Sequence, residues 1–475
     1  MNKKIIKLLK GLFLVTPLLL AVWGLTRAGE APLDALFTGV IMYSLNYDES
    51  PVNGLVELAR WLAPMATAGG LIMLFEPLVR RISARLRSLR ADSVVFYGDE
   101  DEYKTLKKQL RSVPVTRGED RLLAGRRVVL FRDEAESLRF YLDHQEELAG
   151  REVYMRCSSL RSQEIRGGRL HLFSTEELGA RLFWKQAGLY GQFCEQGPSL
   201  RIALVGFGSL GEQLLLWGLQ NNIFSPDQNI CYEVFGEPEG FLELHRELSR
   251  VGDRVCFHGD WKEDIPLLQS ADRILVCRQE DQLLLVEELL FALSGKTLDI
   301  LAARPEELSM LEAGERLRIF PWKETALLPE NLFDDRTLTC AKAINLRYAH
   351  LYSGVDETAE NAEKEWDGLN SFTRYSNISA ADYHEIRLQM MRHWGCASAD
   401  GLSPEQLELL SELEHIRWCR FHWLNNWSYG APVNGKSKNA AARTHADLVP
   451  YEALTEGDKE KDRENIRTLL SVTLG

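Results

Sequence analysis

The feature that most constrains this chain is the confinement of its apolar excess to the first 80 of its 475 residues. Two uncharged runs stand out there, at residues 11–26 and 61–75. Each run is slightly short for a bilayer core of about 30 Å, but flanking Lys and Arg side chains can reach the interface. We therefore predict transmembrane helices at about residues 5–26 and 61–79. A cleaved signal peptide is the alternative for the first run, and the second run argues against it.

Charges around the two runs predict an orientation. Basic residues lie on their outer flanks, and acidic residues lie between them. Because cytoplasmic loops carry an excess of Lys and Arg, both termini are expected in the cytoplasm. The expected location is therefore the bacterial inner membrane, with a multi-pass topology.

The segment at residues 32–47 is apolar enough to dip into a bilayer but too short to cross it and return. Helix, re-entrant segment and helix together resemble the plan of the two-helix ion-channel superfamily. That resemblance implies a channel-like pore and a homo-oligomer, most simply a tetramer. Residues 43–48 read YSLNYD, which departs from a potassium filter, so potassium selectivity is not expected. An amphipathic surface helix with a simple membrane anchor is the alternative.

Composition limits the partners of the remaining chain. Its formal net charge of -13 argues against a nucleic-acid partner, which needs clustered Lys and Arg. The eight cysteines are irregularly spaced and follow the apolar region, as in a reduced cytosolic body. A chain of this length exceeds one core. We predict a transmembrane region at residues 1–90, a degenerate α/β domain at 91–197 and a nucleotide-binding α/β domain at 198–334. Residues 335–404 are expected to form a helical linker or an extension of the terminal module, which covers residues 405–475.

Alternating strands and helices follow the membrane region. In the first α/β unit, short apolar strands at 93–97 and 127–131 are each followed by a helical pattern. Such alternation predicts a parallel, Rossmann-like sheet. The turn after the first strand reads GDED, which would repel a phosphate. We interpret this unit as a copy that binds no nucleotide.

The second α/β unit carries a stronger signal. A strand at 200–205 runs directly into Gly206-Phe-Gly208-Ser-Leu-Gly211, and a helix follows. Glycines at this spacing permit a tight turn, a close approach to a pyrophosphate, and helix packing. If no nucleotide binds, they serve only the turn and the packing. The expected cofactor-binding residues are Gly206, Gly208, Ser209, Leu210, Gly211, Glu237 and Asp260.

Both α/β units resemble the regulator-of-potassium-conductance domain, of the TrkA-N type. The resemblance covers about residues 91–330 and rests on the glycine motif, on Gly259-Asp260 after a strand, and on the run SADRILV. It implies that an adenine or nicotinamide nucleotide binds as a regulatory ligand and is not redox-active.

The last 70 residues hold the most specific pattern. A helix with His415-x-x-Trp418 is followed by Trp427-x-Tyr429-Gly and by His445-x-x-Leu-Val-x-Tyr451. This pattern resembles the ryanodine-receptor repeat (RyR) domain, a module that we expect to be all-α. The resemblance implies an adenine-type ligand stacked on Trp418, although the tryptophans can also be core residues. The expected ligand residues are Trp418, Glu414, Arg417, Trp427, Tyr429, His445, Tyr451 and Lys459.

Together these features predict a multidomain membrane protein that responds to a nucleotide. We expect a ligand-gated pore that acts in bacterial stress or phage defence. Its expected partners are the lipid bilayer, a nucleotide and further copies of the same chain. One alternative is a membrane-anchored nucleotide sensor that does not conduct. A second is a membrane-tethered NAD-dependent oxidoreductase. The sequence contains no recognisable catalytic constellation, so we expect no enzyme activity.

Overall fold

The computed structural model describes residues 3–87, 90, 92–110, 113–117, 126–157, 169–311, 314–333 and 336–472. Within its helices and turns, the side chains of residues 3–14, 69–81, 84, 85, 87, 399, 469, 471 and 472 are outside this description. The chain forms two compact units, one of residues 1–95 and 118–125 and the other of residues 96–117 and 126–475.

The first unit is helical. Its elements are α1 (Lys3–Arg27), α2 (Pro32–Ile41), the 3-10 turn η1 (Met42–Ser44) and α3 (Gly54–Arg87). Small side chains let the helices approach one another, and Ala21, Ala35 and Ala59 lie in their shared core. The Asn53 side chain also donates a hydrogen bond of 2.7 Å to the Gly24 carbonyl, which ties the start of α3 to α1.

The expectation of a membrane protein is contradicted by this structure. Among the residues that the structure describes, no helix is both long enough and apolar enough to cross a membrane. A span needs about 20 consecutive apolar residues. The described side chains of α1 run only from Val15 to Arg27, and those at the start of α3 include Glu57 and Arg60. The rest of both predicted helices lies outside the residues whose side chains are described.

Two further expectations change with it. Within the expected re-entrant segment at 32–47, residues 32–41 form a regular helix and residues 42–44 a 3-10 turn, because their backbone hydrogen bonds are satisfied locally. The multi-pass location in a bacterial inner membrane is corrected for the same reason as the helices. The expected tetramer rested on a pore of that type, and self-association stays a prediction.

The first sheet of the second unit confirms the α/β alternation. Its strands follow the order β2-β1-β3-β4-β5, an order known from doubly wound flavodoxin-like folds. Strands β3, β4 and β5 are parallel. The elements are β1 (Val94–Gly98), α4 (Glu100–Gln109), β2 (Val115–Arg117), β3 (Arg126–Leu130), α5 (Glu134–Asp143), α6 (Gln145–Leu148), β4 (Glu152–Arg156), β5 (Leu170–Phe173), α7 (Thr175–Gln186) and α8 (Tyr190–Gln196).

The second sheet has the strand order of a dinucleotide-binding fold. From edge to edge it reads β11-β10-β9-β6-β7-β8, and every pairing is parallel. Counted along the chain this is the order 3-2-1-4-5-6, which reverses between β6 and β9. The elements are β6 (Ser199–Val205), α9 (Ser209–Asn221), β7 (Asn229–Phe235), α10 (Phe241–Leu244), η3 (Leu248–Arg250), β8 (Arg254–His258), η4 (Trp261–Asp264), α11 (Ile265–Ser270), β9 (Arg273–Val276), α12 (Gln282–Ala292), β10 (Leu298–Leu301), η5 (Pro305–Met310), η6 (Gly314–Arg316), β11 (Leu317–Phe320), α13 (Trp322–Ala326) and α14 (Pro329–Leu332).

The C-terminal part is mainly helical but not all-α. A small sheet of two-residue strands, in the order β12-β14-β13, follows α18, because the polar loop after Trp427 pairs with residues 444–445. The elements are α15 (Arg336–Ser353), α16 (Ala359–Gly368), α17 (Ser371–His393), η7 (Ala399–Gly401), α18 (Pro404–Leu424), β12 (Ser428–Tyr429), β13 (Lys438–Asn439), β14 (Thr444–His445), η8 (Tyr451–Ala453) and α19 (Glu456–Val472).

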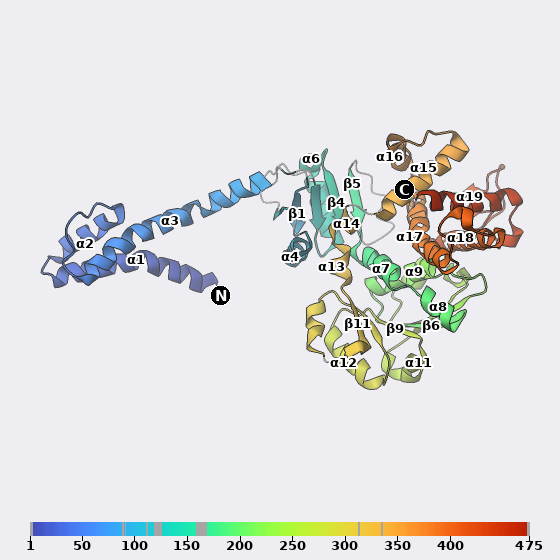
Figure 1. Ribbon diagram of the computed structural model, residues 1–475, viewed down its shortest axis with the longest axis horizontal. Coiled ribbons are helices and arrows are strands. Elements are labelled where there is room, and N and C mark those ends of the chain that lie inside the picture. Colours follow the sequence, from blue (N-terminus) through green and yellow to red (C-terminus); the bar gives the residue numbers. More distant parts are fainter. Residues whose placement is uncertain are drawn as a thin grey trace. The chain divides into compact units, whose positions relative to one another are not determined.

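These helices share one core with the six-stranded sheet. Figure 1 shows α17 and α18 beside α9, on one face of that sheet. Leu413 and Ile466 of the C-terminal part lie in the same apolar cluster as Leu204 of β6. At this interface the Arg420 guanidinium of α18 donates to Asp253, and both residues are buried. The C-terminal helices therefore form part of the compact body and are not a separately tethered domain.

Removing the Asp253 charge should destabilise this interface strongly. In Asp253→Asn the buried Arg420 cation loses its partner, and such losses cost about 3–5 kcal/mol. Urea unfolding of the full chain measures the change. The control is Glu307→Gln, which removes the exposed partner of Arg304 and should cost less than about 1 kcal/mol. Equal effects of the two substitutions would contradict this account of the interface.

Candidate ligand-binding sites

The glycine turn between β6 and α9 has the geometry of a phosphate loop. Gly206 has a φ of 96°, and a Cβ there would lie 2.5 Å from the Arg278 Cβ. A Cβ on Gly211 would lie 2.8 Å from the Gly206 carbonyl oxygen. These two glycines are therefore required by the turn and by helix packing. A Cβ on Gly208, in contrast, would meet no atom within 4 Å, so this position leaves space for a ligand.

The other predicted residues of this site differ in what they can offer. Ser209 begins α9 and is exposed, whereas the Leu210 side chain lies in the core, so only its backbone N–H faces the turn region. The first N–H groups of a helix have no intrahelical acceptor and can receive an anion. Glu237 is exposed just beyond β7. The Asp260 carboxylate accepts a 2.9 Å hydrogen bond from the Lys262 N–H, so it caps η4.

In the C-terminal part, Trp418 lies among three histidines. Its indole is 4.0 Å from the His422 ring and 4.9 Å from the His445 ring, measured between centroids. His415 lies further away, at 5.8 Å and nearly parallel. Trp418 is partly exposed, so its ring is accessible at the centre of a polar aromatic cluster.

Burial keeps these three histidines neutral, and hydrogen bonds decide which ring nitrogen carries the proton in His415 and His445. Burial lowers the pKa of His415, His422 and His445, so all three rings are neutral at pH 7. His415 Nε2 donates to the Val449 carbonyl at 2.8 Å, and His445 Nδ1 accepts from the Asp447 N–H at 3.2 Å. The partly exposed indole therefore has three neutral imidazoles as neighbours, whose donors and acceptors suit the edge of a heterocyclic base.

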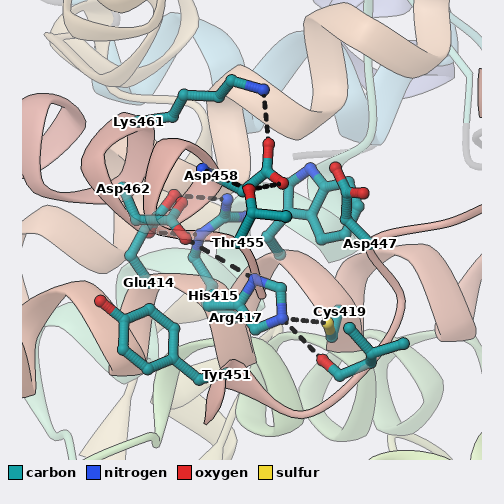
Figure 2. Close-up of polar contacts among 12 residues, drawn as sticks. Glu414, His415, Arg417, Cys419, Asp447, Tyr451, Thr455, Asp458, Lys461 and Asp462 are labelled. Carbon is teal, nitrogen blue, oxygen red and sulfur yellow. Dashed lines mark hydrogen bonds and ion pairs between the residues drawn. The ribbon is translucent and has the colours of Figure 1, made fainter. Parts of the chain in front are cut away.

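A protonated carboxyl group completes this cluster. Burial, together with the nearby Glu414 charge, raises the pKa of Asp462 to about 8. Figure 2 shows His415 between Asp462 on one side and Cys419 on the other, with Nδ1 3.6 Å from the Asp462 oxygen. A protonated Asp462 can donate where an ionised one could only accept.

The predicted ligand residues of this part fall into two groups. Glu414, Arg417 and Trp427 are buried and serve the fold: the first two form an ion pair at 2.8 Å, and the third stacks on Phe372. Tyr429 is exposed on β12. His445 belongs to the Trp418 cluster, and Tyr451 and Lys459 lie at its edge.

Sequence reasoning left out His415, His422 and Asp462 as ligand residues. The signal for the histidines was their spacing from Trp418, which places all three residues close together along α18. The signal for Asp462 was its place four and eight residues before Ile466 and Leu470, which are buried on α19. An acidic residue on the same helix face as buried apolar residues is expected to be buried itself, whereas an acidic residue on the opposite face is expected in water.

A cavity of about 300 Å³ lies elsewhere, between α7, α14, α15 and α17. Its lining includes Arg181, Lys185 and Asp382, and the Asp382 carboxylate forms ion pairs with both cations. It shares no lining residue with the glycine turn or with the Trp418 cluster, and Arg181, Lys185 and Asp382 are paired with one another.

Comparison with known proteins identifies the C-terminal part. Residues 403–475 match the RyR domain family. This finding confirms the resemblance that the sequence pattern indicated, and residues 403–475 are called the RyR module below. Among solved structures, one subunit of the dipicolinate synthase from Bacillus halodurans is similar, with 9% identity and a TM-score of 0.23, over 52% of this chain and 98% of that chain. That similarity carries no argument about this chain. A comparison with curated proteins gives no match.

The raised pKa of Asp462 predicts a pH dependence of folding. The unfolded chain loses this proton near 3.8, while the folded chain keeps it up to about 8. The folded state therefore binds more protons in this window, and its stability falls as pH rises through it. Asp462→Asn keeps the neutral form, so its stability relative to the wild type should rise by up to about 1.4 kcal/mol per pH unit.

Urea unfolding across this window measures the effect. The control is Asp458→Asn on the same helix, because hydrogen bonds from Lys461 and Thr455 lower the pKa of Asp458. That substitution should instead lose stability above the usual carboxyl pKa. A stability difference between Asp462→Asn and the wild type that stays constant with pH would contradict a protonated Asp462.

Proposed function

We propose that this chain is a nucleotide-responsive sensor in which a ligand at the glycine turn changes the state of the RyR module. The ligand class is an adenine or nicotinamide nucleotide, held as a regulator and released unchanged. The observation that supports this most is the contrast among the three glycines: Gly206 and Gly211 have no room for a Cβ, and Gly208 has open space. The turn also lies at the strand-order reversal, where sheets of this order bind their ligands.

The glycine turn contacts the end of helix α18 through a chain of aromatic side chains. Phe207 lies inside the turn, and its ring is 5.2 Å from that of Phe241 on α10. The Phe241 ring is in turn 4.5 Å from His245. His245 Nδ1 donates to the Leu424 carbonyl at 2.6 Å, at the last residue of α18. A ligand that moves Phe207 would therefore act on this helix end through Phe241 and His245.

The same helix end supports Trp418. Asn426 donates to the Leu244 carbonyl at 2.6 Å, which fixes the segment after α18 to α10. Four residues earlier, His422 packs on the Trp418 indole and donates through Nδ1 to its carbonyl at 2.8 Å. Two ligands on these sites would influence each other only if each binds two arrangements of this segment unequally.

The RyR module is itself a second candidate ligand site. Its partly exposed indole, with neutral histidines around it, favours a planar, uncharged ring such as a purine base. Arg417, which we expected among the ligand residues, is buried against Glu414, so a charged part of the ligand would be bound by lysines at the rim such as Lys459. This arrangement supports recognition of the base more than of the phosphates.

Binding at the glycine turn is tested by Gly208→Ala. The substitution adds a Cβ at a φ of -115°, which an alanine adopts freely, so the unliganded protein should keep its stability. The methyl group would occupy space needed by a phosphate. In thermal unfolding with a panel of adenine and nicotinamide nucleotides, the wild type should gain about 2.7 kcal/mol at 100 times Kd, and the variant should lose this gain.

The matched control is Gly191→Ala on α8, which also has open space for a Cβ and should keep the full gain. Equal gains for Gly208→Ala and the wild type would remove the glycine turn as the site. No gain for the wild type with any nucleotide would overturn the proposed function. Oxidation or reduction of the bound nucleotide during the assay would instead favour an oxidoreductase.

Binding at the RyR module is tested by Trp418→Leu. Loss of stacking on an aromatic ring costs roughly 1–3 kcal/mol per base, so affinity for adenosine or an adenine nucleotide should fall accordingly. The control is Trp423→Leu on the same helix, because Trp418 and Trp423 are both partly buried against the same apolar cluster. Isothermal titration of the full chain measures both variants. Unchanged affinity in Trp418→Leu, or equal losses in both, would contradict a stacking role for Trp418.

A further inference from the structure

A polar cluster lies on β7 and β8, the two outer strands on one side of the six-stranded sheet. Cys231 and Glu233 follow each other with one residue between them on β7, and Cys256 and His258 do so on the edge strand β8. Register pairs Glu233 with Cys256, so all four side chains leave the sheet on the same face. Buried parallel strands are normally apolar throughout, so this cluster has a cost that packing does not explain.

The side chains converge on a small volume. Cys231 Sγ, a Glu233 carboxylate oxygen and Cys256 Sγ lie within 4.8 Å of one another. Cys231 Sγ is 3.3 Å from Glu233 Oε1, and His258 Nε2 is 2.7 Å from Glu233 Oε2. Tetrahedral coordination by such donors separates them by about 3.3–3.8 Å, so Cys231, Glu233 and Cys256 are close enough to supply three ligands. His258 would become the fourth by turning its Nε2 from the Glu233 carboxylate to the cation.

We propose that Cys231, Cys256, Glu233 and His258 bind one thiophilic divalent cation of the zinc class. Two thiolates, an imidazole and a carboxylate are the donors that zinc takes in tetrahedral sites, and thiolates exclude hard ions such as magnesium and calcium. This inference does not rest on the proposed function. The structural effect of the site is to fasten the edge strand β8 to β7.

Charge and access agree with this assignment. Two thiolates and one carboxylate carry one negative charge more than the cation neutralises, and Arg201 and Arg254 lie beside the cluster. Arg201 Nε is 3.4 Å from Glu233 Oε1, and Arg254 Nη2 is 3.9 Å from Cys256 Sγ. His258 is 28% exposed, so a cation can enter from the sheet edge.

Binding requires the loss of thiol protons. In the metal-free protein the Cys231 thiol donates to Glu233, and burial together with that carboxylate raises the pKa of Cys231 to about 12. A cation replaces this proton and the proton of Cys256, so both are released to solvent as the two metal–sulfur bonds form. The thiols are not oxidised in this step.

Cobalt titration of the reduced, chelator-treated full chain tests the proposal. One equivalent of Co²⁺ should produce thiolate-to-cobalt charge-transfer absorption and the strong visible bands of a tetrahedral site, and Zn²⁺ should displace it. Cys231→Ser and Cys256→Ser should each abolish the charge-transfer signal. The control is Cys194→Ser, which removes an exposed cysteine of α8 outside the cluster and should keep the full signal.

A second measurement needs no variant. Zn²⁺ should protect Cys256, but not the exposed Cys194, from maleimide alkylation mapped by mass spectrometry. The proposal is overturned if the wild type gives no charge-transfer absorption, or if Cys231→Ser retains it. It is also overturned if protection of Cys256 needs an oxidant and not the metal, because a Cys231–Cys256 disulfide would then account for the cluster.

Discussion

The buried contact between Arg420 and Asp253 is the constraint on which the arrangement of this protein depends. Asp253 lies in the loop before β8, and its carboxylate also accepts 3.2 Å hydrogen bonds from Gln228. The Arg420 guanidinium reaches it from α18 and donates as well to the Leu219 carbonyl at 2.8 Å. A guanidinium and a carboxylate that are both buried must stay together, because separating them would leave two uncompensated charges. The RyR module is therefore held against the sheet at one orientation.

That orientation brings two candidate ligand sites into mechanical contact. The end of α18 is linked to the Phe207 ring of the glycine turn through Phe241 and His245, and it carries the His422 ring that packs on Trp418. Its hydrogen bonds to α10 join backbone carbonyls with side chains and leave little freedom for independent movement. The proposed cation site lies on the same sheet and fastens β8, which follows the loop that holds Asp253.

Much of this fold could be predicted from the sequence, because it depends on interactions between residues that are close together along the chain. The strand before Gly206, the glycine spacing and the helix after it follow from backbone conformations that neighbouring residues impose on one another. The RyR pattern could be recognised because it combines aromatic and histidine residues at fixed spacing. The small sheet at β12–β14 was missed because its strands have only two residues each, too few to produce an alternating pattern. The membrane assignment failed because hydropathy was judged on short runs.

The sequence by itself determined the α/β alternation, the glycine turn and the identity of the terminal module, since each depends on residues close together along the chain. Only the tertiary structure decided which polar residues are available. From the sequence we predicted Glu414 and Arg417 as ligand contacts. In the structure Glu414 instead forms buried ion pairs with Arg417 and with Arg387 of α17. Arg420 and Asp253 are 167 residues apart, and a charge acquires its partner only when packing removes both from water. The roles of these residues are therefore set by burial, which no local pattern specifies.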